Sequence, residues 1–139
     1  MATFKTVYPG NLRTEITHLQ SGNILITDAP TDNHGKGEFF SPTDLLASAL
    51  GSCILTIMGI AAKTHGFSID GTSVETTKVM GSGPRRVVEL IVKITFPHNS
   101  YSAKEVKILE TCARECPVAN SLHPDLKQTV SFIFQEINR

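Results

Sequence analysis

The chain has no surplus of charge of either sign. Its 139 residues include 13 lysines and arginines and 13 acidic residues, so the formal net charge is +0. Proteins that bind nucleic acid or anionic membranes through bulk charge usually carry a basic surplus. Because basic residues do not cluster here beyond Arg85 and Arg86, we expect neither a nucleic-acid partner nor electrostatic attraction to a membrane.

Cysteine is scarce as well. The three cysteines are Cys53, Cys112 and Cys116, and an odd, small number argues against a disulfide framework. A reducing compartment, where any disulfide is transient and redox-active, fits this count best. The first residues, MATFKTVYPGNLR, lack the apolar core and small-residue cleavage site of a secretory signal. We therefore expect a cytoplasmic protein.

Repeats and linkers are also missing from the sequence. With 40% apolar and 19% charged residues, the composition is that of an ordinary soluble globular protein. A chain of this length can build a sizeable hydrophobic core. We predict a single domain over residues 1–139.

One long apolar tract stands out, SPTDLLASALGSCILTIMGIAAKTH, which runs from Ser41 to His65. Ser41 suits the N-cap of a helix, Pro42 the first helical position, and Asp44 the capping-box position three residues after the cap. Gly66 is typical of the residue that follows a helix. The tract predicts one long helix around which the rest of the chain is organised.

The same tract is about long enough to cross a membrane. Small and polar residues interrupt it, however, among them Ser48, Ser52 and Thr56, and strand patterns surround it. A helix that is apolar on several sides also suits the core of a soluble protein. We therefore expect a buried core helix and no membrane partner.

Strand patterns lie on both sides of the predicted helix. Breaks rich in Gly, Pro and Asn separate them and favour antiparallel hairpins. The predicted strands are residues 2–8, 12–19, 24–28, 72–80, 85–97 and 126–137, and further helices are predicted at 102–114 and 117–122. The result is an α+β fold of order β-β-β-α-β-β-α-α-β, with antiparallel sheets packed on the long helix.

Each cysteine could be an unreactive core residue or a reactive thiol. Free cysteine is often a small buried hydrophobe, which suits Cys53 in an apolar helix and Cys112 on the helical stretch before Pro117. Cys116 directly precedes Pro117, so it should be the N-cap of a new helical turn, where the helix dipole and free N–H groups lower the pKa of a thiol. Cys53 lacks that help and would need a nearby cation to be reactive.

Zinc binding is an alternative role for these residues. Cys112, Cys116 and His123, with Cys53 joining them in the fold, would supply enough soft ligands. The CxxxC spacing differs from the usual CxxC knuckle, and Pro117 redirects the chain between the ligands. Our first expectation is that the chain holds no metal and no cofactor.

The segment FFSPTDLLASALGSC, followed later by ECPVANSL, resembles the OsmC/Ohr family of thiol-dependent organic hydroperoxide reductases. The resemblance extends along the whole chain. It implies the family fold and an intertwined homodimer with its sites at the subunit interface. It also implies an enzyme, a peroxidase that needs no cofactor.

The resemblance implies roles for two cysteines. Cys53 matches the family's peroxidatic cysteine, which attacks an organic hydroperoxide and becomes a sulfenic acid. Cys116 matches the resolving cysteine, which forms a disulfide with Cys53. An external dithiol or a lipoylated protein then reduces this disulfide. Cys112 has no counterpart in the motif.

The sequence departs from the family pattern at a carboxylate. The best-studied branches carry a glutamate ten residues before the peroxidatic cysteine, where it holds an arginine against the thiolate; this chain has Thr43 there. Asp44 or Glu38 could replace it, although Asp44 also fits a helix-capping role. Arg13 is the expected arginine, preferred over Lys36 or His34, and its alternative role is a strand-surface pair with Glu15.

The loop 29–40 is longer than a typical connection, which favours a functional role. With the helix, Phe39 and Phe40 predict an apolar pocket that prefers organic hydroperoxides to hydrogen peroxide, and Asp44 is a further candidate substrate-binding residue. A non-enzymatic protein that binds an apolar ligand or senses thiol oxidation is the second hypothesis. The missing glutamate at Thr43 favours it.

Overall fold

The computed structural model describes residues 1–136, and the chain forms two compact units. The first is Met1–Leu46 and the second begins at Ala47, so the boundary falls inside the long helix α1 (Pro42–His65). The elements follow in the order β1-β2-β3-η1-α1-β4-β5-α2-α3-β6. The expectation of a single domain stays a prediction.

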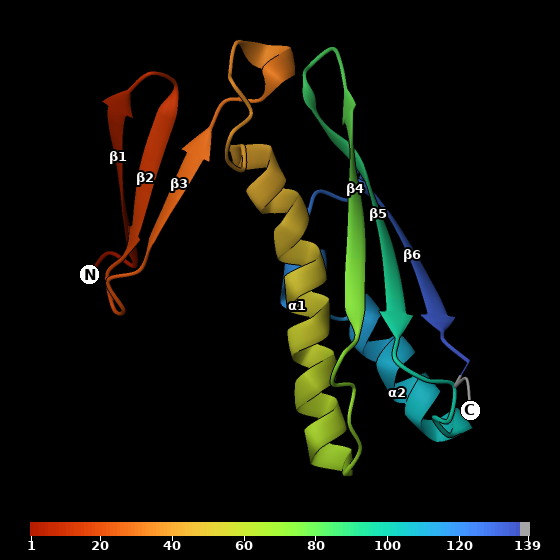
Figure 1. Cartoon of the computed structure of the whole chain (residues 1–139). Coiled ribbons are helices and arrows are strands. Elements are labelled where there is room, and N and C mark those ends of the chain that lie inside the picture. The colour runs from red at the N-terminus through yellow and green to blue at the C-terminus, as the bar shows by residue number, and fades with distance from the viewer. Residues whose placement is uncertain (137–139) are drawn as a thin grey trace. The chain divides into compact units, whose positions relative to one another are not determined.

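The first unit holds a three-stranded antiparallel sheet (Figure 1). Its strands are β1 (Phe4–Gly10), β2 (Arg13–His18) and β3 (Ile24–Asp28), in the order β1-β2-β3. Asn11 (φ 59°) and Leu12 (φ 60°) both have the left-handed conformation. Two such residues are what a tight hairpin turn with the twist of its strands requires. The three predicted strands before the helix are confirmed.

The loop between β3 and α1 is folded tightly on itself. It contains a 3-10 turn, η1 (Thr31–Asn33), which the sequence did not indicate. His34 follows with φ 69°. Gly35 then passes so close to Ala29, the residue after β3, that a Cβ there would lie 1.6 Å from the carbonyl oxygen of Ala29. Only glycine fits this position, and the amide of Gly35 donates to the carbonyl of Pro30 at 2.9 Å.

Helix α1 begins with the predicted capping box. The amide of Asp44 donates to Ser41 Oγ at 3.1 Å, and the amide of Ser41 donates to Asp44 Oδ2 at 2.9 Å. These two bonds satisfy amides that the helix itself leaves free. Gly66, at φ 78°, follows the last residue of the helix. Both predicted ends of α1 are confirmed.

Within the second unit, α1 is a core helix. Its buried side chains include Leu50, Ile54 and Met58, which recur every four residues and form one face. A Cβ at Gly51 would approach Val74 Cγ1 to 2.8 Å, so the small residue lets strand and helix pack closely. By length and composition alone α1 could also cross a membrane, and 33% of its most apolar window is buried in the protein.

The second sheet is mixed, which corrects the prediction of antiparallel sheets. Its strands are β4 (Ser73–Gly81), β5 (Arg86–Phe96) and β6 (Lys127–Phe134), in the order β4-β5-β6. The β4–β5 pair is antiparallel, but β6 runs parallel to β5, with Val130 opposite Val92. The last strand was predicted to end at position 137, which lies outside the described residues.

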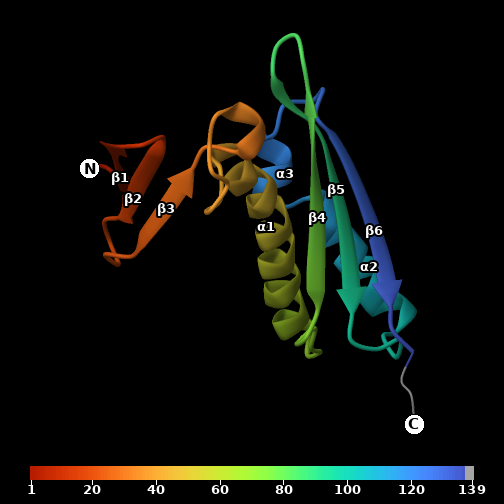
Figure 2. The same cartoon turned by 45° about the horizontal axis from the view of Figure 1, so that its top comes forward.

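The parallel pair has a physical cause in the connection. Helices α2 (Ala103–Arg114) and α3 (Pro117–Ser121) lie between β5 and β6 in the chain (Figure 2). A parallel pair needs such a crossover, whereas an antiparallel pair needs only a tight turn. The two helices were predicted, so the parallel direction of β6 could have been read from them.

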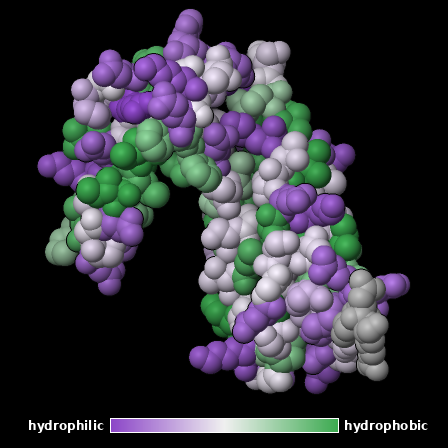
Figure 3. Space-filling view, viewed as in Figure 1, coloured by the Kyte–Doolittle hydropathy of each residue, from purple (hydrophilic) through white to green (hydrophobic). Residues whose placement is uncertain are grey.

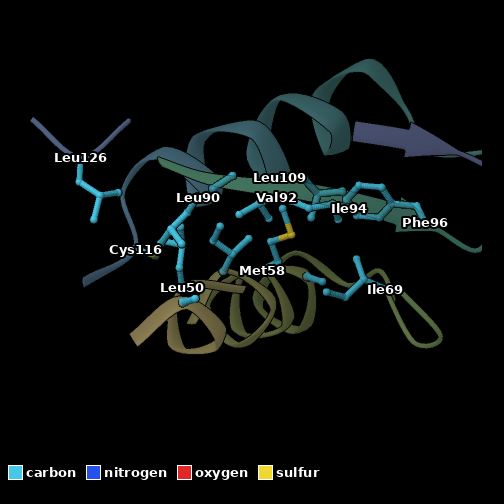
Figure 4. Close-up of a cluster of buried hydrophobic side chains, with 14 of the residues drawn as sticks. Leu50, Met58, Ile69, Leu90, Val92, Ile94, Phe96, Leu109, Cys116 and Leu126 are labelled. Atoms are coloured by element: carbon cyan, nitrogen blue, oxygen red, sulfur yellow. The ribbon is translucent and has the colours of Figure 1, made fainter. Parts of the chain in front are cut away.

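The core of the second unit joins α1, β5 and α2 (Figure 4). Leu90, Val92, Ile94 and Phe96 alternate along β5 and are fully buried, as their two-residue period predicted, and Leu109 of α2 is also fully buried. Burying one such side chain contributes about 1.5–3 kcal/mol. Cys116 belongs to this same cluster.

Candidate active site

Cys116 is the N-cap of α3, as the sequence predicted. Its backbone is extended (φ −69°, ψ 144°), Pro117 follows at the first helical position, and the Cys116 Sγ accepts the amide of Ala119 at 3.3 Å. The side chain is fully buried. Pro117 has no amide to donate and starts the turn, so the sequence Cys-Pro by itself places the sulfur at the free amides of α3.

The Cys53 side chain lies against Cys116. Cys53 comes from the middle of α1, is partly exposed and packs against the core cluster that contains Cys116, near enough to its thiol to shift the pKa of that thiol. Both cysteines are free thiols. The fold thus brings together the two cysteines that the resemblance pairs.

Burial raises the pKa of the Cys116 thiol above its ordinary value. The amide of Ala119 lowers the pKa, while the hydrogen bond to Cys53 and the charge of Cys53 raise it further. The lowered pKa that the helix dipole predicts is therefore the wrong direction, because the burial of the thiol outweighs the dipole of a helix of 5 residues.

Cys112 is separate from this pair. It lies half-buried on α2, and burial followed by the charge of Glu115 raises the pKa of its thiol. Among the interactions of residues 1–136, no hydrogen bond joins Cys112 to Cys53 or Cys116. A protonated, half-buried thiol is a slow nucleophile, which fits the interpretation of Cys112 as a core residue.

A metal site finds no support in the described residues. No group of three or more His, Cys, Asp and Glu side chains lies close enough together in residues 1–136 to hold an ion. His123, one of the ligands considered, instead lies 3.8 Å from Asp125. The zinc alternative therefore has no ligand set in this part of the chain.

Arg13, in the first unit, lies between two carboxylates. Its Nη2 is 3.1 Å from Glu38 Oε2 and 3.6 Å from Asp28 Oδ2. Its guanidinium also lies over the ring of Phe39, 5.0 Å from the centroid. The alternative pair with Glu15 is therefore wrong. Glu38, which the sequence left as one of two choices, is a carboxylate at this arginine.

Asp28 is the partner that the sequence interpretation missed. It is 1% exposed, pairs directly with Arg13 across the β2–β3 ladder, and accepts the amide of Glu38 at 3.1 Å. A buried carboxylate needs such partners, because desolvating it alone is costly. The register of the predicted hairpin, with Asp28 opposite Arg13, was a signal that could have found it.

The other predicted site residues are Asp44, Phe39 and Phe40, with Thr43 at the position of the missing glutamate. Asp44 is in the capping box with Ser41, and the hydroxyl of Thr43 lies 3.2 Å from that of Ser41. Phe39 and Phe40 are 42% and 57% exposed. Phe39 contacts Arg13, and the carbonyl of Phe40 accepts the amide of Asp28 at 3.1 Å. Their roles in substrate binding stay predictions.

Comparison with known proteins identifies the family of this chain. The family model of the OsmC-like protein matches residues 35–131, so the chain belongs to the OsmC-like family. A crystal structure from Psychrobacter arcticus 273-4, a candidate osmotic stress induced and detoxification response protein, is 54% identical, covers 95% of this chain and 96% of its own, and has a TM-score of 0.90. A comparison with curated proteins finds no match.

Two more distant structures share the fold. An organic hydroperoxide resistance protein OsmC from Legionella pneumophila is 16% identical with a TM-score of 0.71, and covers 96% of this chain and 99% of its own. An organic hydroperoxide resistance protein from Elizabethkingia anophelis is 14% identical with a TM-score of 0.74, and covers 97% of this chain and 98% of its own. At these identities the likeness concerns the fold alone.

Proposed function

We propose that this protein reduces organic hydroperoxides to alcohols by thiol chemistry. The observation that carries the proposal is the contact between Cys53 on α1 and Cys116 at the start of α3. Two free thiols that meet inside a fold, one partly exposed and one buried, suit a reaction that alternates between dithiol and disulfide. The names of the two distant hydroperoxide resistance proteins agree with this activity.

The first step uses Cys53. Its thiolate attacks the terminal oxygen of the hydroperoxide, the O–O bond breaks, and the alkoxide takes a proton and leaves as the alcohol, while Cys53 becomes a sulfenic acid. The raised pKa of Cys116 supports this division of roles, because Cys116 stays protonated and its S–H can donate to the sulfur of Cys53.

The second step uses Cys116. Its sulfur attacks the sulfur of the Cys53 sulfenic acid, the S–O bond breaks, and a Cys53–Cys116 disulfide and water form. An external dithiol or a lipoylated protein reduces the disulfide and is itself oxidised to a disulfide. Such a cycle needs a reducing compartment, which is why we assign the protein to the cytoplasm.

Arg13 is the proposed cation of the reaction. Asp28 and Glu38 fix the position of its guanidinium, and a fixed cation beside a sulfur favours the thiolate. In this proposal the pair of carboxylates takes the place of the glutamate that is absent at Thr43.

We propose a homodimer as the working form. Among residues 1–46 no apolar side chain is buried, and Figure 3 shows apolar surface over the first sheet. Its exposed apolar side chains include Phe4 at 57%, Tyr8 at 63% and Ile24 at 56%. A second copy would cover such a surface. Light scattering during size-exclusion chromatography should give twice the chain mass, and a monomer at micromolar concentration would contradict this.

Stopped-flow kinetics tests the activity. The wild type should consume cumene hydroperoxide faster than hydrogen peroxide and then lose two hydrogens in a cross-linked peptide that carries Cys53 and Cys116. The Cys116→Ser variant should react once and stop as a sulfenic acid, which dimedone traps. If Cys53→Ser consumes cumene hydroperoxide as fast as the wild type, the proposal is wrong.

A non-enzymatic binding or sensing protein is the second candidate. One observation favours this second candidate: Arg13 is paired with two carboxylates, whose charges together exceed its own. An arginine in this state stabilises a neighbouring thiolate less well. Mass spectrometry after mild peroxide treatment discriminates the two, because a pure binding protein would form no Cys53–Cys116 disulfide.

A further inference from the structure

Gln128 is the polar exception among the inward-facing side chains of β6. Burial alternates along this strand, and its half-buried positions are Gln128, Val130, Phe132 and Phe134. The last three pack against the core of the second unit, whereas Gln128 lies opposite the fully buried Leu90 of β5. A glutamine at such a position loses contact with water, so it needs hydrogen-bond partners within the protein.

The partner of Gln128 is the backbone of α3. Gln128 Nε2 donates to the carbonyl oxygen of Ala119 at 3.1 Å. The amide of Asn120 belongs to the same peptide group as this carbonyl, and it donates to the carbonyl oxygen of Cys116 at 3.1 Å. Gln128 is therefore linked to the backbone of Cys116 through a single peptide group, and hydrogen bonds in such a chain strengthen one another.

The turn that Gln128 contacts also holds the sulfur of Cys116. The amide of Ala119 donates to Cys116 Sγ at 3.3 Å. Helix α3 has 5 residues, and none of them is fully buried. A helix this short is not stable by itself, so contacts from other elements must fix its position. The hydrogen bond from Gln128 on β6 is such a contact.

We propose that Gln128 is a positioning residue for the closure of the Cys53–Cys116 disulfide, an inference that rests on the two-thiol reaction proposed above. In closure the sulfur of Cys116 attacks the sulfur of Cys53, and a disulfide tolerates only a narrow range of backbone separations and dihedral angles. Gln128 acts through the backbone, because it holds the peptide group that holds Cys116. The attack of Cys53 on a peroxide does not involve α3, so Gln128 should affect the second step and not the first.

An aromatic disulfide reagent, dithiobis-nitrobenzoate, tests closure without any peroxide. The full-length protein carries Cys112→Ser, which removes the third thiol. Cys53 attacks the reagent, forms a mixed disulfide and releases one thionitrobenzoate; Cys116 then attacks the sulfur of Cys53, closes the protein disulfide and releases the second thionitrobenzoate. Stopped-flow absorbance separates the two releases, so the positioning of Cys116 is measured in the second phase alone.

Gln128→Met keeps the length of the side chain and removes its donor. The first phase should stay within about twofold of the parent rate, and the second should slow about three- to tenfold, the effect expected for one neutral hydrogen bond. Gln128→Glu keeps the shape, but its carboxylate cannot donate to a carbonyl at neutral pH, so it should slow the second phase as well. The matched control is Thr129→Val, which removes a 2.6 Å hydrogen bond to Glu89 from the exposed side of β6 and should leave both phases unchanged.

The proposal is overturned by an unchanged second phase in Gln128→Met, by an equal slowing of both phases, or by an equal slowing of the second phase in Thr129→Val. Amide hydrogen exchange provides a second measurement. The amide of Asn120 should exchange faster in Gln128→Met, while that of Leu50 in α1 should not change. Unchanged exchange at Asn120 would also overturn the proposal.

The positioning role and the peroxidase reaction can fail separately. If Cys53→Ser consumes cumene hydroperoxide as fast as the wild type, the peroxidase reaction is wrong, but the second phase still reports whether Gln128 positions Cys116. If peroxide consumption depends on Cys53 and the second phase is insensitive to Gln128, only the positioning role is wrong. A parent protein that releases one thionitrobenzoate and no second forms no disulfide, which would overturn both.

Discussion

The two units of the chain bury their side chains very differently. In the second, Leu50, Ile54, Leu90 and Ile94 are fully buried, and the two thiols that meet lie against this core. In residues 1–46 the buried side chains are polar, and apolar ones such as Ile24 are exposed. The second unit can hold a geometry by its own packing, whereas the first fixes Arg13 through ion pairs and leaves its apolar surface open.

This difference in burial explains why the thiol pair lies in the second unit and the ion-paired arginine in the first. A buried thiol needs the low dielectric and tight packing of a core, because both keep Cys116 protonated and close to Cys53. The arginine of the first unit has the opposite setting, because it is half-exposed and held by one buried and one exposed carboxylate. The predictions below test this contrast, from the largest expected effect to the smallest.

The thiol in the second unit should dominate activity. We predict that Cys53→Ser lowers kcat/KM for cumene hydroperoxide by on the order of 10³-fold or more, since it removes the nucleophile. Stopped-flow measurement of peroxide consumption checks this. The matched control is Cys112→Ser, which should stay within about twofold of the wild type because Cys112 is bonded to neither partner. A large loss in Cys112→Ser would show that the wrong pair has been assigned.

Truncating a buried side chain of the second unit should lower the free energy of unfolding more than truncating an exposed side chain of the first unit. We predict that Ile94→Ala lowers the free energy of unfolding by about 2–5 kcal/mol, because Ile94 is fully buried. Ile24→Ala, at a side chain that is 56% exposed, should cost much less in the isolated chain. Urea denaturation measures both. A loss for Ile24→Ala that changes with protein concentration would instead place Ile24 in a subunit interface and sharpen the contrast.

The arginine in the first unit should have a smaller effect on activity than the thiol. We predict that Arg13→Lys lowers kcat/KM about tenfold, because lysine keeps the charge but loses the fork that two carboxylates hold. The matched control is Lys5→Gln, which alters charge on the same sheet away from Arg13. An unchanged rate in Arg13→Lys would remove Arg13 from the reaction and leave the thiol pair as the whole site.

The smallest effect concerns pH. The pKa of Cys116 is raised above its ordinary value of 9.0 in the folded state, so folding disfavours its thiolate. The stability that protonated Cys116 contributes is therefore complete below pH 9 and is lost as the pH rises through the higher folded pKa. As the pH rises above 9, the urea concentration at the midpoint of unfolding should fall less in Cys116→Ala than in the wild type. Parallel pH curves for both proteins would contradict a raised pKa.

Some of the fold could be predicted because its signals are local. The capping box of Ser41 and Asp44, the cap at Cys116 before Pro117, and the buried alternation along β5 each depend on residues a few positions apart. The parallel direction of β6 was missed because strand patterns carry no direction; only the two helices before it did. The pKa direction of Cys116 was missed because burial is a property of the packed core.

The site was predicted unevenly for the same reason. Cys53 and Cys116 were found through a resemblance and not through spacing, since no local rule relates residues so far apart in the chain. Arg13 was proposed, but its partner Asp28 was overlooked. The partner of an arginine on a strand depends on the register of the hairpin, which the sequence analysis did not work out for residues 12–28.

The sequence by itself determined the main helices and strands and both ends of α1, because capping, turn and alternation chemistry act over a few residues, but it did not indicate η1. It also determined that three thiols exist in a chain with no net charge to attract a nucleic acid. Only the tertiary structure decided that Cys53 meets Cys116 and that Cys112 bonds to neither. It also decided that Arg13 lies between a buried and an exposed carboxylate. The physical reason is that these contacts join distant segments, and packing of the whole chain selects which segments meet.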